Sequence, residues 1–237
     1  MRQKIDAVIL AAGVGSRISQ LSKEMPKGFI QINGETLIER SLKLLNNNNF
    51  KNIYIVTGYK KEHYEQLANK YKNVITINNY KYSETGSFGT FLMIAEHIHN
   101  SFLLLESDLL YEEKILKELI SDNRENIIAT SDHTNSGDEI YVKDDDSILI
   151  NMSKNKNLIG KKSSEFIGIN KISFKLFNYL ISNYSNEGLK EYEDLLVMSS
   201  KENNIYVKKI NDVTWCEIDN LIHLKRAKEI IYPQLNK

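Results

Sequence analysis

The chain has 237 residues, enough for one α/β domain with a sizeable buried core. Lysine plus arginine and aspartate plus glutamate each count 31, so the formal net charge is zero. This balance argues against a nucleic-acid partner, because nucleic-acid-binding domains are strongly basic. The single cysteine, Cys216, excludes an internal disulfide framework and suits a reducing compartment.

The N-terminal segment combines basic residues with an apolar run, which is also how a signal peptide begins. Arg2 and Lys4 precede the run Ala7–Ala12, but Asp6 interrupts the junction. A glycine-containing loop ends the run after about six residues, short of the apolar region of a signal peptide. The run therefore predicts a buried first strand. Since no apolar stretch approaches the roughly 18 residues of a membrane span, we expect a cytoplasmic protein without a membrane partner.

Short apolar runs alternate with helical patterns through the first half of the chain. The predicted strands are Ala7–Leu10, Asn52–Thr57, Val74–Ile77, Phe102–Leu105 and Ile127–Ala129. The predicted helices, with apolar residues at three- and four-residue spacing, are Leu37–Leu45, Lys61–Tyr71, Thr90–Ile98 and Glu112–Ile120. The alternation predicts an α/β fold with a Rossmann-like, mostly parallel sheet flanked by helices. Such sheets bind ligands beyond the carboxyl ends of their strands.

The second half of the chain changes character and predicts a small β-rich elaboration. Ile140–Lys143 and Ile148–Met152 have the pattern of a hairpin. The further predicted elements are strands Phe166–Asn170 and Ile205–Ile210, helices Ser173–Ile181 and Tyr192–Lys201, and a closing helix Asn220–Ile230. Asn220 is expected to cap the closing helix. We expect a single domain over residues 1–237.

A glycine-containing loop follows the first predicted strand. The segment Leu10-Ala11-Ala12-Gly13-Val14-Gly15-Ser16-Arg17 is followed nine residues later by Pro26-Lys27. Glycines let backbone N–H groups approach phosphates, and Arg17 and Lys27 add two cations where a triphosphate would lie. A dinucleotide-binding loop is disfavoured, because Ile18 occupies the third glycine position. A P-loop is excluded, because no Gly-Lys-Ser/Thr follows the glycines.

Acidic residues follow two further strand-like segments. Asp108 ends the segment Leu103-Leu104-Leu105-Glu106-Ser107-Asp108, at the carboxyl end of a central predicted strand. Glu217 and Asp219 are two residues apart near the C-terminus, so on an extended segment they share a face. Because Mg²⁺ bound to a nucleotide usually takes one or two protein carboxylates, these acids are candidate ligands.

The glycine segment with Pro26-Lys27 resembles the signature of the nucleoside-triphosphate transferase superfamily. This superfamily includes sugar-phosphate nucleotidyltransferases and phosphocholine cytidylyltransferases, and the later elements of the chain follow in the expected order. The resemblance implies a nucleotide-binding core at residues 1–130 and an acceptor-side elaboration at 131–210. It implies a metal motif and closing helix at 211–237.

The resemblance also implies roles for individual residues. The backbone of Leu10, Ala11, Ala12 and Gly13 would line the nucleotide, while Arg17 and Lys27 would stabilise the triphosphate and its transition state. Asp219, with Glu217, would join Asp108 around Mg²⁺. The segment 84–90 precedes a helix, and its residues Gly86, Ser87 and Thr90 would help to read the base.

Several blocks resemble the 2-aminoethylphosphonate cytidylyltransferases more narrowly. These blocks are residues 84–87, 103–110, 135–139 and 151–156. By this resemblance Lys154 would bind the phosphonate of the acceptor.

The acids near these blocks bear on the acceptor's head group. A trimethylammonium group is best held by an aromatic cage, whereas a primary ammonium has three donors and prefers carboxylates. The segment that starts the predicted helix near residue 192 carries one aromatic residue among three acids, and a second acidic pair lies upstream. The residues expected to contact the acceptor are Asp138, Glu139, Glu191, Tyr192 and Glu193. Their acidity favours a primary amine.

The sequence therefore predicts an Mg²⁺-dependent cytidylyltransferase that transfers CMP from CTP to 2-aminoethylphosphonate, giving CMP-2-aminoethylphosphonate and pyrophosphate. Phosphocholine and a sugar 1-phosphate are alternative acceptors. A catalytically silent nucleotide-sensing domain is an alternative of a different class, although Lys27, Asp108 and Asp219 together argue against it. Oligomeric state and base preference do not follow from the sequence.

Overall fold

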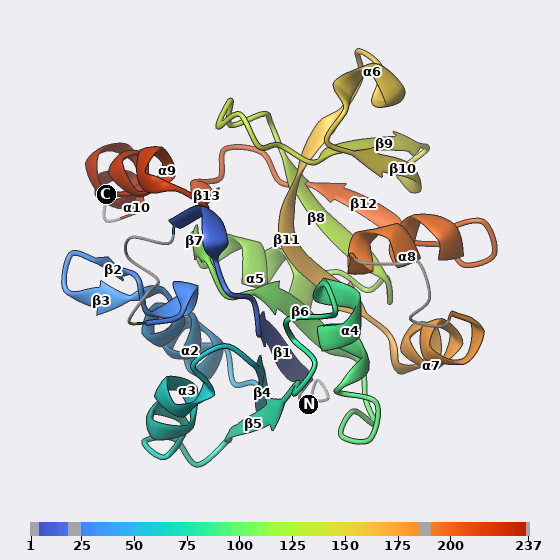
Figure 1. Ribbon diagram of the computed structural model, residues 1–237. Coiled ribbons are helices and arrows are strands. Elements are labelled where there is room, and N and C mark those ends of the chain that lie inside the picture. The colour runs from blue at the N-terminus through green and yellow to red at the C-terminus, as the bar shows by residue number, and fades with distance from the viewer. Residues whose placement is uncertain (1–4, 19–24, 185–190, 236–237) are drawn as a thin grey trace.

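The computed structural model describes residues 5–18, 25–184 and 191–235. Within these residues a nine-stranded sheet forms the centre of the molecule, in the order β5-β4-β1-β6-β11-β8-β12-β10-β9 (Figure 1). Its strands are β1 (Asp6–Ala11), β4 (Ile53–Thr57), β5 (Val74–Asn78), β6 (Phe102–Glu106), β8 (Ile127–Ser131), β9 (Tyr141–Asp145), β10 (Ile148–Ser153), β11 (Ser164–Ile172) and β12 (Tyr206–Lys209). Two short ribbons pair β2 (Gln31–Ile32) with β3 (Glu35–Thr36) and β7 (Leu109–Tyr111) with β13 (Trp215–Glu217).

The first half of the sheet is parallel, as the strand–helix alternation predicts. β1 pairs in parallel with both β4 and β6, and β5 extends the sheet beyond β4. All six residues of β1 are buried. A strand that is apolar on both faces fits a sheet covered by helices on both sides. The carboxyl ends of β1 and β6 therefore lie side by side.

β11 makes the sheet mixed. It runs antiparallel to β6 on one side and to β8 on the other, and its first residues also pair with β9. The register with β8 shifts between Phe166 and Asn170, and Gly168 within this stretch has a φ of 83°. The hairpin β9–β10 at the far edge of the sheet is the predicted β-rich elaboration.

Helices cover both faces of the sheet. They are α2 (Leu37–Asn47), α3 (Lys61–Ala68), α4 (Ser87–Leu92), α5 (Lys114–Ser121), α6 (Lys156–Ile159), α7 (Phe174–Asn183), α8 (Tyr192–Ser199), α9 (Leu221–Arg226) and α10 (Tyr232–Leu235), with short helical segments η1 (Ser16–Ile18), η2 (Lys27–Phe29) and η3 (Ala227–Ile231). Ile9 of β1 packs in one core with α2, α3 and α5. Its neighbour Val8 packs in a second core with α4, α7 and α8. Alternate β1 side chains thus serve opposite cores, as strand geometry requires.

A third, smaller core attaches the C-terminal segment to the glycine loop. It contains Ile18, Leu110, Cys216, Leu224 and further apolar residues of the β2–β3 ribbon and of η3. The closing helix is formed by α9, η3 and α10 in succession, and Asn220 caps it by accepting a hydrogen bond from the backbone of His223, as predicted. This packing brings the C-terminal acids to the N-terminal loop.

Helix ends and the shortest elements differ from the sequence expectation: α3 ends at Ala68 and α8 at Ser199, and the four-residue α6 was not predicted. The helix predicted at Thr90–Ile98 begins at Ser87 and ends at Leu92, and the residues after it form turns. The ribbon strands β2, β3, β7 and β13 are two or three residues long, too short to leave a periodic pattern. Among the described residues, no helix is long and apolar enough to cross a bilayer.

Candidate active site

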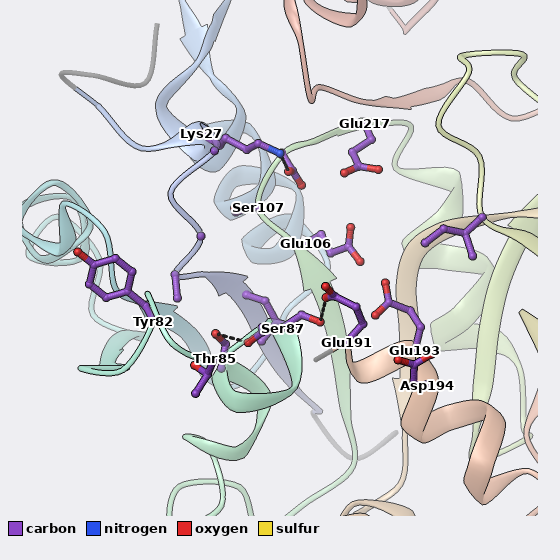
Figure 2. Close-up of a pocket in the computed structure, with 18 of the residues that line it drawn as sticks. Lys27, Tyr82, Thr85, Ser87, Glu106, Ser107, Glu191, Glu193, Asp194 and Glu217 are labelled. Carbon is purple, nitrogen blue, oxygen red and sulfur yellow. Dashed lines mark hydrogen bonds and ion pairs between the residues drawn. The ribbon is translucent and has the colours of Figure 1, made fainter. Parts of the chain in front are cut away.

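A cavity of about 610 Å³ lies beyond the carboxyl ends of β1 and β6. Its walls come from the glycine loop, the N-terminus of α4, the end of β6, the end of β10 and the first turn of α8 (Figure 2). The residues named from the sequence that line it are Leu10, Ala12, Gly13, Arg17, Lys27, Gly86, Ser87, Thr90, Asp108, Lys154, Glu191, Glu193 and Glu217. Segments far apart in the sequence therefore converge on one site.

The glycine loop packs directly against Lys27. Gly15 has a φ of 66°, and a Cβ built on it would lie 2.7 Å from Lys27 Cγ. Only a glycine fits both the left-handed backbone and this close approach. Gly13 faces open space within the cavity wall. The side chain of Ala11 packs in the core of α2, α3 and α5, so only its backbone is left for the nucleotide contact that is expected of it.

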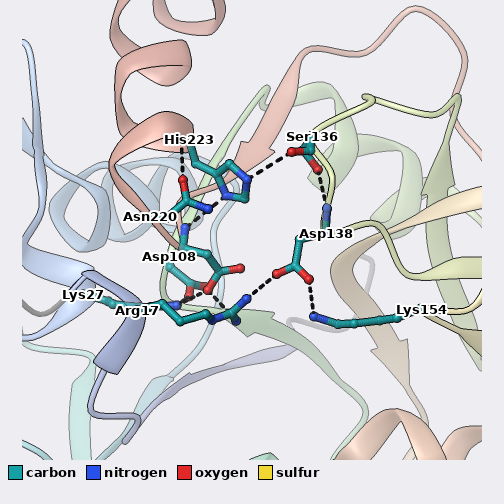
Figure 3. A network of polar contacts seen from close by, with 9 residues as sticks. Arg17, Lys27, Asp108, Ser136, Asp138, Lys154, Asn220 and His223 are labelled. Carbon is teal, nitrogen blue, oxygen red and sulfur yellow. Dashed lines mark hydrogen bonds and ion pairs between the residues drawn. The ribbon is translucent and has the colours of Figure 1, made fainter.

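Both predicted cations are held by carboxylates (Figure 3). Lys27 Nζ donates to Asp108 Oδ2 at 2.8 Å and to Asp219 Oδ1 at 2.5 Å. Arg17 donates to the same Asp219 Oδ1 at 2.8 Å and to Asp138 Oδ2 at 2.5 Å. The side chain of Lys27 is 14% exposed and that of Arg17 55% exposed. Lys27 is thus a fixed cation in the wall, and Arg17 is a more open one at the rim.

The electrostatics of Lys27 and Asp219 depend on each other. Burial lowers the pKa of Lys27, but the charges of Asp108 and Asp219 outweigh burial and hold this pKa above its ordinary value. Burial raises the pKa of Asp219, but the ammonium of Lys27 outweighs it and holds the pKa well below its ordinary value. Both groups are therefore charged near neutral pH.

A cluster of three carboxylates lies next to Lys27. Oxygens of Glu106, Asp108 and Glu217 come within 4.8 Å of one another. The antiparallel pairing of β13 with β7 places Glu217 opposite Leu109, and the N–H of Ile218 donates to the carbonyl of Asp108 at 3.1 Å. This pairing brings an acid from the C-terminal segment to the end of β6.

The members of this cluster crowd like charges together. Burial, followed by the charges of Asp108 and Glu106, raises the pKa of Glu217 well above its ordinary value. Burial, followed by the charges of Glu193 and Asp108, does the same to the pKa of Glu106. A bound cation would relieve this repulsion.

The cluster differs in membership from the predicted ligand set. Asp108 and Glu217 belong to it as expected, and sequence reasoning missed Glu106. Asp219 turns its Oδ1 towards the two cations, while its Oδ2 is buried without a hydrogen-bond partner. Glu106 precedes Asp108 by two residues, so the same-face argument applied to Glu217 and Asp219 would have found it.

The donor set fits a hard divalent cation such as Mg²⁺. Three carboxylates from the end of β6 and from β13 supply oxygen ligands, which Mg²⁺ prefers over nitrogen or sulfur. The buried, unpartnered Oδ2 of Asp219 is a further oxygen close by. Glu106, Asp108 and Glu217, with Asp219, are therefore the residues that could hold the ion.

Acids line the end of the cavity formed by α8 (Figure 2). Glu191, Glu193 and Asp194 all line the cavity there. The Oε2 of Glu193 is buried and has no hydrogen-bond partner. Burial, with the like charges of Glu191 and Asp194, raises the pKa of Glu193 to about 7. A ligand that brings positive charge would stabilise this end of the cavity.

Ser87 joins the nucleotide side to the α8 side. Its Oγ donates to Glu191 Oε2 at 2.7 Å and accepts from the backbone N–H of Tyr192 at 2.9 Å. Ser87 thus ties α4 to the start of α8 in addition to lining the cavity. Thr90 accepts a hydrogen bond from the amide of Asn79 at 3.1 Å, which fixes its hydroxyl inside the wall.

Tyr192 does not face the acceptor end of the cavity. Its side chain is buried in the core of α4, α7 and α8 and does not line the cavity. Its hydroxyl donates to Glu106 Oε1 at 2.7 Å and accepts from the amide of Asn170 at 3.3 Å. The acceptor contact predicted for Tyr192 is therefore wrong, because the residue begins α8 on its core-facing side.

The loop between β8 and β9 carries the remaining predicted residues. Asp138 accepts from Lys154 Nζ at 2.7 Å as well as from Arg17, so it bridges the two sides of the site (Figure 3). Glu139 accepts from the N–H of Gly137 at 3.2 Å and from the hydroxyl of Tyr141 at 3.3 Å. Glu139 is buried in the loop and does not line the cavity. Glu139 thus shapes the loop, whereas Asp138, which does not itself line the cavity, contacts two cations that do.

Other elements hold this loop in place. Both the N–H and the hydroxyl of Thr134 donate to Glu165, and Arg226 donates to the carbonyl of Thr134 at 2.7 Å. His223 Nε2 donates to the carbonyl of Ser136 at 3.3 Å, and its Nδ1 accepts from the N–H of Asp219 at 3.4 Å. The C-terminal segment thus anchors both the loop and the acids.

Comparisons with known proteins agree on one superfamily. The sequence model of the MobA-like NTP transferase domain matches residues 7–143. The chain is 27% identical to a choline-phosphate cytidylyltransferase of Streptococcus pneumoniae, in an alignment that covers 95% of this chain and 97% of that protein. It is 24% identical to a 2-aminoethylphosphonate cytidylyltransferase of Lancefieldella rimae, in an alignment that covers 94% of this chain and 91% of that protein. The structure of the inositol-1-phosphate CTP transferase from T. maritima superimposes with a TM-score of 0.85 at 18% identity, covering 99% of this chain and 96% of that one.

Proposed function

Because the chain belongs to the MobA-like NTP transferase family and is a nucleotidyltransferase, we propose that it transfers CMP from CTP to 2-aminoethylphosphonate and releases pyrophosphate. The proposal rests on the order of charges along one cavity. Two cations at the glycine loop are followed by a carboxylate cluster and then by an acid-lined end. A triphosphate, a metal-bound reacting centre and an amine fit these three parts in turn.

The chemistry needs no general base in the protein. An oxygen of the phosphonate, already an anion near neutral pH, attacks the α-phosphorus of CTP and forms the new P–O bond. The bond from the α-phosphorus to the bridging oxygen breaks, and pyrophosphate leaves with the electron pair. Lys27 and Arg17 would exchange aspartate oxygens for phosphate oxygens and offset the charge that builds on the leaving group. Positioning and charge stabilisation are then the main tasks of the protein.

The carboxylates would hold the metal ion of this reaction. Glu106, Asp108 and Glu217 would bind Mg²⁺, with the Oδ2 of Asp219 as the further oxygen expected from the sequence. When bound, Mg²⁺ would supply positive charge beside the triphosphate.

The cavity lining favours a primary ammonium on the acceptor. Glu191, Glu193 and Asp194 can accept the three N–H bonds of such a group. Among the described residues that line the cavity, Tyr82 is the one aromatic side chain, and it lies on the opposite side of the cavity from Glu193 (Figure 2). An aromatic cage for trimethylammonium is thus not formed by the described residues.

Phosphocholine is the second candidate acceptor. The Streptococcus pneumoniae relative, 27% identical over nearly the whole chain, is named for it. Phosphocholine shares the anionic nucleophile and differs in having no N–H donor. Lys154, at the end of β10, would meet the phosphonate or phosphate of either acceptor.

The test is a comparison of kcat/KM for 2-aminoethylphosphonate, phosphoethanolamine and phosphocholine, with CTP and Mg²⁺ fixed and pyrophosphate release as the readout. If the partly buried Glu193, together with Glu191 and Asp194, reads the ammonium, discrimination against phosphocholine should approach roughly 10⁴-fold, whereas shape alone gives about 10–200-fold. Phosphoethanolamine keeps the amine and separates reading of the head group from reading of the phosphonate. Equal or better use of phosphocholine would contradict the proposed acceptor while leaving nucleotidyl transfer intact.

A further inference from the structure

Tyr192 is built into the wall behind the carboxylate cluster. The residue is 2% exposed. Its ring stacks on Phe91, with centroids 6.4 Å apart and planes at 22°, and lies 6.4 Å from the ring of Phe166 at 55°. Rings from α4 and β11 therefore fix its position.

The hydrogen bonds of Tyr192 fix the direction in which its hydroxyl points. The amide of Asn170 donates to the hydroxyl oxygen at 3.3 Å, and the hydroxyl donates its one proton to Glu106 Oε1 at 2.7 Å. Asn170 is fully buried in β11. The carboxylate of Glu106 thus receives a directed bond from a group that is itself held.

β11 also shapes the space on the other side of Glu106. A Cβ built on Gly168 would lie 3.1 Å from both Cδ and Oε2 of Glu106. Any side chain at this position would press on the carboxylate, and the φ of 83° at Gly168 is one that L residues rarely adopt. The carboxylate is therefore confined between Tyr192 and the Gly168 backbone.

We propose that Tyr192 is a positioning residue for the metal site: its hydroxyl holds the Glu106 carboxylate in the orientation in which it joins Asp108 and Glu217 around a divalent cation. The inference rests on the metal assignment in the proposed function. Ligating carboxylates generally need such outer hydrogen bonds, whose loss typically costs 10–100-fold in metal affinity. Because Tyr192 starts α8, the same turn that presents Glu193 to the acceptor also orients a metal ligand.

The experiment measures Mn²⁺ binding to the protein without nucleotide or acceptor, by electron paramagnetic resonance of free Mn²⁺. Tyr192→Phe removes only the hydroxyl and should weaken Mn²⁺ binding about 10–100-fold. The matched control is Tyr179→Phe, because the hydroxyl of Tyr179 donates to Glu202 at the same 2.7 Å but outside the site. This control should bind Mn²⁺ as the wild type does. Thermal unfolding of each variant shows that it is folded.

A second variant tests whether Tyr192 acts through Glu106. Glu106→Gln should also weaken Mn²⁺ binding, and Tyr192→Phe should then add little in the Glu106→Gln background. Tyr192→Phe binding Mn²⁺ within about twofold of wild type would overturn the inference, as would full additivity of the two changes. A wild-type protein that binds no Mn²⁺ would also overturn it. None of these outcomes touches the acceptor comparison, so failure of the acceptor proposal is recognised separately.

Discussion

The two ends of the cavity handle charge differently. At the glycine-loop end, Lys27 and Arg17 both form ion pairs with carboxylates of the protein. At the α8 end, Glu191, Glu193 and Asp194 form no ion pair with a described residue, although all three line the cavity. The cations of one end are therefore neutralised in advance, and the acids of the other end are not.

This difference in charge pairing means that the two ends favour different ligand groups. A triphosphate must exchange with the aspartates, so its net gain is smaller than two cations would suggest, but the cations need no rearrangement when charge develops. The Oε2 of Glu193, buried without a hydrogen-bond partner, costs free energy at this end of the cavity. A cationic group on the ligand would lower this cost.

The largest effect should come from removing the fixed cation. Lys27→Ala deletes the ammonium that stabilises the leaving pyrophosphate and should lower kcat/KM by roughly 10²–10³. Steady-state pyrophosphate release measures it. Lys43→Ala is the control, because Lys43 is an exposed lysine of α2 that pairs only loosely, at 3.8 Å, with Glu35. A folded Lys27→Ala enzyme within threefold of wild type would remove this residue from the chemistry.

The next largest effect on kcat/KM should come from Glu193, which forms no ion pair with a described residue. Glu193→Gln removes the negative charge facing the ammonium, and a hydrogen bond to a charged group contributes roughly 1.5–3 kcal/mol. We expect kcat/KM for 2-aminoethylphosphonate to fall about 10–100-fold. The same variant should lose little with ethylphosphonate, which has no amine. An equal loss with both acceptors would mean that Glu193 does not recognise the amine.

A third prediction extends the comparison to stability. Glu165, at the base of the loop between β8 and β9, is buried and forms no ion pair within 4 Å of its carboxylate among the described residues. Burial raises the pKa of Glu165 to about 7, against an ordinary 4.5. The carboxyl group therefore stabilises the folded state below about pH 4.5, and this contribution is lost as pH rises to about 7.

Glu165→Gln should remove this pH dependence. Relative to wild type, the free energy of unfolding of the variant should rise by on the order of 2 kcal/mol between pH 4.5 and pH 8. Urea unfolding at the two pH values measures it, with Glu62→Gln on the exposed side of α3 as the control. A difference that stays constant with pH would show that Glu165 is charged at little cost.

The smallest effect should come from the bridging acid. Asp138→Asn frees Arg17 from a partner at the rim, and exposed ion pairs contribute only about 0.2–1 kcal/mol. CTP binding measured by calorimetry should tighten by roughly 1.5–5-fold. Asp132→Asn, which breaks an exposed pair with Lys209, should change nothing. Weaker CTP binding in Asp138→Asn would instead place this acid among the groups that the nucleotide needs.

The predictable parts of the site are those fixed by local backbone geometry. Asp108 lies at the end of a parallel strand, and Lys27 lies against a glycine turn, so both positions follow from neighbouring residues. Glu217 was predicted from its spacing to Asp219 and from the resemblance, but its position beside Asp108 depends on the pairing of two three-residue strands about a hundred residues apart, which no periodicity reveals. The inward direction of Tyr192 depends on where α8 packs, and a helix start alone does not encode this.

The pairing of β7 with β13 also sets when the site can exist during synthesis. Asp108 leaves the ribosome soon after β1, β4, β5 and β6, the strands of the parallel half of the sheet. Glu217 emerges about a hundred residues later, and only then can the third carboxylate reach the other two. Domains form as their parts become available, so a nascent chain that has not reached residue 217 can bury the cores of β1, β4 and β6 without a complete carboxylate cluster. The carboxylate cluster, like the core that holds Ile18 of the glycine loop, is therefore completed only when the C-terminal segment has been made.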